Sequence, residues 1–68
     1  MTYVIELHKE VGLNSFNTML LKTTKKEEDA LLLTHELEQA LDTFKLRKKT
    51  TYRTDGEFTY LCIELRRE

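Results

Sequence analysis

Four side chains of this 68-residue chain have the types that most often perform catalysis or bind metal: Ser15, His8, His35 and Cys62. Zinc uses about four converging nitrogen, sulfur or oxygen ligands, and here one thiol and two imidazoles lie on separate predicted elements. Ser15 lacks the context of a nucleophile elbow. Cys62 lies inside a predicted strand, where a buried and inert thiol is expected. The sequence therefore predicts no enzyme, no metal site and no cofactor.

Small-molecule binding is also disfavoured. Gly12 and Gly56 are the only glycines, and they are too far apart in sequence to form a phosphate-binding loop. A domain of this length is too small to enclose a ligand pocket of several hundred Å³ and still keep a core. We expect no small-molecule substrate.

The closing stretch, residues 45–68, combines Lys and Arg with Tyr and Phe. Asp55-Gly56 between two strand-like runs predicts a hairpin, and with these two as the loop residues Arg53 lies opposite Phe58. The alternation then separates two faces. The aliphatic face contains Leu46, Tyr52, Leu61, Ile63 and Leu65, and the mixed face contains Arg47, Lys49, Thr51, Arg53, Phe58, Tyr60 and Cys62.

A helix is predicted over residues 25–44. Thr24 and Glu27 fit an S/T-x-x-E capping box, and acidic residues fill the first turns. An apolar stripe at helical spacing is formed by Ala30, Leu33, Leu37, Ala40, Leu41 and Phe44. Leu31 and Leu32 fall outside this stripe, either as ordinary exposed leucines or as a contact for a partner.

Two further strands are predicted before the helix. Residues 2–9 alternate, with Tyr3, Ile5 and Leu7 on the core side and Val4, Glu6 and His8 on the mixed face. Gly12 and Asn14 supply a turn. Residues 15–24 form the second strand, whose phase is ambiguous and would be explained by a bulge. We therefore expect one domain over residues 1–68 with the order β-β-α-β-β: an α+β fold in which one helix packs on one face of a four-stranded antiparallel sheet.

Composition points to a cytoplasmic protein without a membrane contact. Cys62 is the only cysteine, the first residues do not resemble a secretory signal, and no apolar run approaches the roughly 20 residues that span a bilayer. A chain without proline and rich in Lys and Glu is typical of small bacterial and bacteriophage proteins. Residues 25–44 hold six acids and two lysines, whereas residues 45–53 hold five cations and no acid. These blocks are expected to attract each other, within the chain or between copies.

These features favour a non-enzymatic protein-interaction module, which binds a larger protein or itself as a homodimer. The residues expected to contact the partner are Arg47, Lys49, Arg53, Phe58, Tyr60, Leu31 and Leu32. The alternative is single-stranded nucleic-acid binding, with Phe58 and Tyr60 stacking on bases and the three cations contacting phosphates. The net charge of −1 weighs against that alternative.

Overall fold

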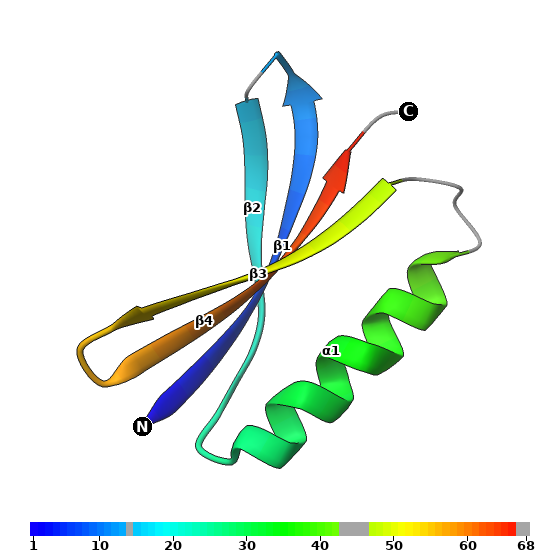
Figure 1. Ribbon diagram of the computed structural model, residues 1–68. Coiled ribbons are helices and arrows are strands. Elements are labelled where there is room, and N and C mark those ends of the chain that lie inside the picture. Colours follow the sequence, from blue (N-terminus) through cyan, green and yellow to red (C-terminus); the bar gives the residue numbers. More distant parts are fainter. Residues whose placement is uncertain (14, 43–46, 67–68) are drawn as a thin grey trace.

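Two β-hairpins joined by a helix make up residues 1–13, 15–42 and 47–66, the part of the chain that the computed structural model describes (Figure 1). In chain order the elements are β1 (Thr2–Gly12), β2 (Ser15–Thr24), α1 (Glu27–Leu41), β3 (Arg47–Asp55) and β4 (Phe58–Arg66). The helix lies between β2 and β3, and the α+β class is confirmed. The predicted roles of Asn14, Phe44 and Leu46 lie outside the described residues.

The sheet has the order β2-β1-β4-β3 and is mixed, so the prediction of a purely antiparallel sheet is wrong. Each hairpin is antiparallel, but β1 and β4 pair in parallel, with Ile5 beside Leu61 and Glu6 beside Cys62. The physical reason is the connection through α1. A helix that crosses a sheet returns the chain to the end from which it came, so the strands it joins run parallel. Because β2 and β3 then share one direction, their hairpin partners β1 and β4 also do.

The core lies between α1 and the two central strands. Ile5, Leu61 and Ile63 are the largest fully buried side chains, and Ala30 of α1, 0% exposed, packs with Ile5 and Leu61. These two strands supply all the buried apolar side chains of the described sheet, so the central positions suit them, while β2 and β3 form the edges. The predicted core roles of Leu61, Ile63 and Leu65 are confirmed. The predicted core position of Tyr52 is wrong, because Tyr52 lies on edge strand β3 and is 61% exposed.

The helix is shorter than predicted, 15 residues, and among the described residues no helix is long and apolar enough to cross a membrane. The capping box is absent: Lys26 is the N-cap residue, and the Thr24 hydroxyl instead accepts a hydrogen bond from the Lys26 N–H at 3.3 Å. Leu33 and Leu37 pack on the core as predicted, whereas Ala40 is exposed. Thr34 is buried in addition and donates its hydroxyl proton to the Ala30 carbonyl.

A β-bulge explains the ambiguous phase of the second strand. Lys22 lies opposite Ile5 and Leu20 lies opposite Glu6, so Leu21 is the extra residue in β2. Leu21 packs against the core cluster, while Leu20 is left exposed. A single alternation cannot describe a strand that changes phase in its middle.

The register of the second hairpin differs from the predicted one by one residue pair. Arg53 lies opposite Tyr60 and Asp55 opposite Phe58, which leaves Gly56 and Glu57 as the turn. Gly56 has a φ of 58°, a left-handed conformation that glycine adopts without steric cost. Because the shift preserves the alternation of side chains, both predicted faces remain correct.

Candidate functional site

The sheet face away from α1, here called the open face, carries the mixed set of side chains. From the registers it contains Val4, Glu6, His8 and Glu10 of β1, Phe16, Thr18 and Leu20 of β2, Arg47, Lys49, Thr51, Arg53 and Asp55 of β3, and Phe58, Tyr60, Cys62, Glu64 and Arg66 of β4. No pocket is found among residues 1–13, 15–42 and 47–66. The open face therefore offers a surface rather than an enclosed site.

The structure divides the seven predicted partner residues into two groups. Arg47, Lys49, Arg53, Phe58 and Tyr60 share the open face. Leu31 and Leu32 lie on α1 in the other layer, 45% and 58% exposed. One partner surface does not contain all seven.

Cationic side chains already cover the aromatic rings of the open face. The Arg53 guanidinium lies 4.4 Å from the centroid of Tyr60, and the Tyr60 and Phe58 rings are 6.2 Å apart. On the opposite side of the face, the Arg66 guanidinium lies 5.0 Å from the centroid of Phe16. Such contacts keep an uncovered aromatic face compatible with water.

Acidic side chains are interleaved with these cations. Glu64 forms an ion pair with Arg66 at 3.2 Å and lies opposite Lys49. Glu6, Glu10 and Asp55 belong to the same face. The face as a whole therefore lacks the basic excess that phosphate recognition requires.

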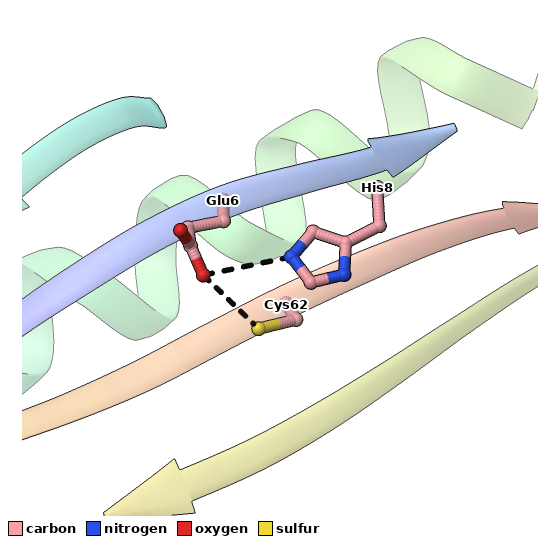
Figure 2. Close-up of side chains that lie close together, drawn as sticks. All are labelled: Glu6, His8 and Cys62. Atoms are coloured by element: carbon pink, nitrogen blue, oxygen red, sulfur yellow. Dashed lines mark hydrogen bonds and ion pairs between the residues drawn. The ribbon is translucent and has the colours of Figure 1, made fainter. Parts of the chain in front are cut away.

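Near the middle of the open face, Glu6, His8 and Cys62 form a compact cluster across β1 and β4 (Figure 2). Their ligand atoms all lie within 4.8 Å of one another. The Cys62 thiol donates to Glu6 Oε1 at 3.5 Å, and His8 Nε2 lies 3.5 Å from the same oxygen. Glu6 and His8 are two residues apart on β1 and therefore point to the same face, and the parallel pairing with β4 places Cys62 beside Glu6.

The environment of Cys62 keeps its thiol protonated at neutral pH. Burial raises the pKa of Cys62 above 9.0, and the hydrogen bond to Glu6 and the negative charge of that carboxylate raise it further. The positive charge of Arg53 and a hydrogen bond with Thr51 oppose this shift without cancelling it. A thiol with a raised pKa forms less thiolate than an ordinary cysteine, which lowers its reactivity as a nucleophile.

The sequence prediction missed this cluster, although the necessary signal was present. The face assignment put Glu6, His8 and Cys62 on one side of the sheet, but β1 and β4 are the two ends of the chain. Only the parallel pairing of these strands, which was not predicted, brings the three groups together. His35 does not belong to the cluster: it lies exposed on α1, a separate element as predicted, with Nε2 3.0 Å from the Gln39 amide nitrogen.

The two edges of the sheet differ in character. Edge strand β3 carries Arg47, Lys48, Lys49 and Arg53, whereas edge strand β2 carries one charge, Lys22. The first hairpin also exposes the large aliphatic side chains of Val11, Leu13, Met19 and Leu20, whereas the exposed large apolar side chain of β3 is that of Tyr52. Charged side chains on an edge strand hinder pairing with another chain, and an uncharged edge permits it.

The two charge blocks predicted from the sequence do meet. Lys48 of β3 forms an ion pair with Asp42, and the Thr50 hydroxyl donates to the Glu38 carboxylate. Part of the acidic and basic segregation is therefore used inside the chain, to hold the end of α1 against edge strand β3.

Comparisons with protein-family models, curated proteins and solved structures found no match to this chain.

Proposed function

We propose that the protein is a non-enzymatic interaction module that forms a homodimer by pairing β2 with β2 of a second copy. The observation that carries this proposal is the uncharged, apolar edge. From Ser15 to Leu21 the strand has no ionisable side chain, and Met19 and Leu20 are 59% and 62% exposed. An edge strand presents a row of backbone groups that can form hydrogen bonds with another strand.

The sequence of β2 is self-complementary in an antiparallel pair. Phe16 to Leu20 pairs regularly with β1 and ends at the bulge. A two-fold axis at Thr18 would place Phe16 opposite Leu20 of the second copy, both on the open face. Cross-strand pairs of an aromatic and an aliphatic side chain stabilise a sheet. Closed two-fold pairing is also the commonest symmetry of soluble oligomers.

The other edge disfavours the same arrangement. Two β3 strands paired antiparallel would bring Arg47, Lys48, Lys49 and Arg53 of each copy close together, and like charges facing each other across strands are destabilising. The β2 edge is therefore the proposed dimer contact, and the cationic β3 edge and the open face remain for a larger protein partner. Cys62 is the only cysteine and is buried, so the fold uses no disulfide within the chain, and this supports our proposal of a reducing compartment, the cytoplasm.

Sedimentation equilibrium over a concentration series tests the proposal. The mass should rise from one chain, 8.1 kDa, to a limit of two chains. Thr18→Lys would place two ammonium groups at the proposed axis and should hold the protein at one chain. The matched control is Thr54→Lys, the same replacement at an exposed position of the β3 edge, which should leave the association unchanged.

A mass of one chain at concentrations up to about 1 mM would contradict the proposal. The dissociation constant would then exceed about 1 mM, and the free energy of dimerisation would be smaller than about 4 kcal/mol. Equal loss of association in both variants would also contradict it. A mass that grows beyond two chains would indicate head-to-tail pairing of unlike edges in place of a closed dimer.

Nucleic-acid binding is the less favoured alternative. Glu6, Glu10, Glu64 and Asp55 share the open face with its cations, and the ring of Tyr60 is occupied by Arg53. A nucleic acid would need to displace these contacts and would meet no net positive field.

A further inference from the structure

The cluster on β1 and β4 has the composition of a metal site. It brings together a carboxylate, an imidazole and a thiol, all of which coordinate divalent zinc. We propose that Glu6, His8 and Cys62 bind one zinc ion as three protein ligands, with a water molecule in the fourth position. The cluster lies on the two central strands, so this inference does not depend on dimerisation through β2.

The distances are close to those of a tetrahedral site. With usual zinc bond lengths to nitrogen, oxygen and sulfur, the ligand atoms of a tetrahedron lie roughly 3.4–3.6 Å apart. Two edges already have this length, Cys62 Sγ to Glu6 Oε1 and His8 Nε2 to Glu6 Oε1, both 3.5 Å. The third pair lies within 4.8 Å, so a side-chain rotation that moves Cys62 Sγ and His8 closer by about 1 Å completes the set.

His8 supplies an independent observation. Its Nε2 atom is buried and has no hydrogen-bond partner among the described residues, although Glu6 Oε1 lies 3.5 Å away. Buried polar atoms without a partner are rare in folded proteins, and they often mark a position at which an ion or a water molecule binds. A zinc ion between Nε2 and the Glu6 carboxylate would give this nitrogen its partner.

Charge and donor type favour zinc over the alkaline-earth ions. One thiolate and one carboxylate neutralise a divalent cation, which suits side chains that are mostly buried, Glu6 at 19% and His8 at 23% exposure. Magnesium and calcium prefer oxygen ligands alone, whereas a set with sulfur and imidazole nitrogen suits zinc. The Thr51 hydroxyl, in hydrogen-bond contact with Cys62, is placed to orient the thiolate.

Zinc coordination must replace the proton of Cys62. In the free cluster the Cys62 thiol donates its proton in a hydrogen bond to Glu6 Oε1. A bound metal deprotonates a coordinating thiol outright, and one proton leaves for each zinc ion that binds. The groups around the thiol that bear on this exchange are Glu6 and His8 on β1, Arg53 and Lys49 on β3, and Tyr60 and Glu64 on β4.

Cobalt substitution tests the site directly. Addition of Co²⁺ to the full chain should produce a thiolate-to-metal absorption band in the near ultraviolet and intense visible bands of tetrahedral cobalt, with one ion per chain. Cys62 is the only cysteine, so the thiolate band reports this residue alone. Addition of Zn²⁺ should displace Co²⁺ and remove all these bands, because zinc prefers tetrahedral sites.

The two histidines provide a matched pair of variants. Loss of a group that only supports a metal ligand lowers metal affinity about 10–100-fold. His8→Gln removes a proposed ligand itself, so it should lower zinc affinity more than about 100-fold. His35→Gln removes the exposed helix imidazole and should change the affinity less than about twofold, with circular dichroism confirming that both variants fold. A missing thiolate band, or equal affinities of the two variants, would overturn the proposal.

Protection of the Cys62 thiol from alkylation by bound zinc gives a second test, and this test uses only the wild-type chain. Zn²⁺ should slow alkylation of Cys62 by iodoacetamide in the wild-type chain, whereas Mg²⁺ at the same concentration should not. Equal alkylation rates with and without Zn²⁺ would also overturn the proposal.

Discussion

Replacement of Ile5 by valine removes one methylene from the centre of the core without changing the polarity or the β-branching of the side chain. Ile5 is 0% exposed and packs with Leu61 and Ala30, so its side chain contacts the neighbouring strand and the helix together. A change at this position reports whether α1 truly covers β1.

The expected magnitude follows from burial. A methylene removed from a fully buried site costs about 0.8 kcal/mol in transfer free energy, and the cavity left behind adds to this, so the total should be about 1–1.5 kcal/mol. A chain of this length is stable by only about 3–10 kcal/mol, so such a loss is a large fraction of the total. It should lower Tm by about 4–8 °C per kcal/mol. Ile5→Ala would cost about 2–5 kcal/mol and bring the protein close to unfolding.

Urea unfolding and thermal melts followed by circular dichroism measure this change. Val11→Ala is the control, because Val11 lies on the same strand but is 45% exposed, and its replacement should change stability by less than about 0.5 kcal/mol. If Ile5→Val cost no more than Val11→Ala, the placement of α1 over β1 would be refuted.

Three further predictions concern the second hairpin, the buried thiol and nucleic acid. Gly56→Ala should cost about 1–2 kcal/mol because Gly56 has a positive φ, whereas Gly12→Ala, where φ is ordinary and the added Cβ would meet Ser15 at 3.8 Å, should cost much less in the same urea titration. Burial and Glu6 raise the pKa of Cys62 above 9.0 in the folded chain, so the thiol should ionise more readily in the unfolded chain. The free energy of unfolding should therefore keep its full Cys62 contribution below pH 9.0 and fall above it, and Cys62→Ser should remove that part of the pH dependence. A labelled single-stranded oligonucleotide should show no binding at low salt, and binding that weakened steeply with salt and was reduced by Tyr60→Ala would contradict this expectation.

The sequence was sufficient for features that depend on short-range periodicity. The hairpin at Asp55-Gly56, the separation of its two faces and the exposed Leu31 and Leu32 all follow from alternation or from helical spacing. The error in the predicted register did not disturb the faces. Each residue of β3 lies opposite a β4 residue two positions further along than predicted, and residues two apart in a strand point to the same side.

Features that depend on distant parts of the chain could not be obtained in this way. The pairing of β1 with β4 joins the two ends of the chain, and no local pattern specifies it. The consequence was largest for Tyr52, predicted in the core but exposed on an edge strand, and for Cys62, which gained Glu6 and His8 as neighbours. A cluster of three groups from two strands is visible in sequence only after the neighbouring strands are known.

The most direct test of the proposed dimer is amide hydrogen exchange at two protein concentrations. Self-pairing of β2 predicts that amides of Phe16 to Leu20 that point away from β1 become more protected as concentration rises, while amides of Arg47 to Asp55 that point away from β4 exchange at the same rate. Unchanged exchange along β2, or protection gained along β3 instead, would contradict dimerisation through the β2 edge.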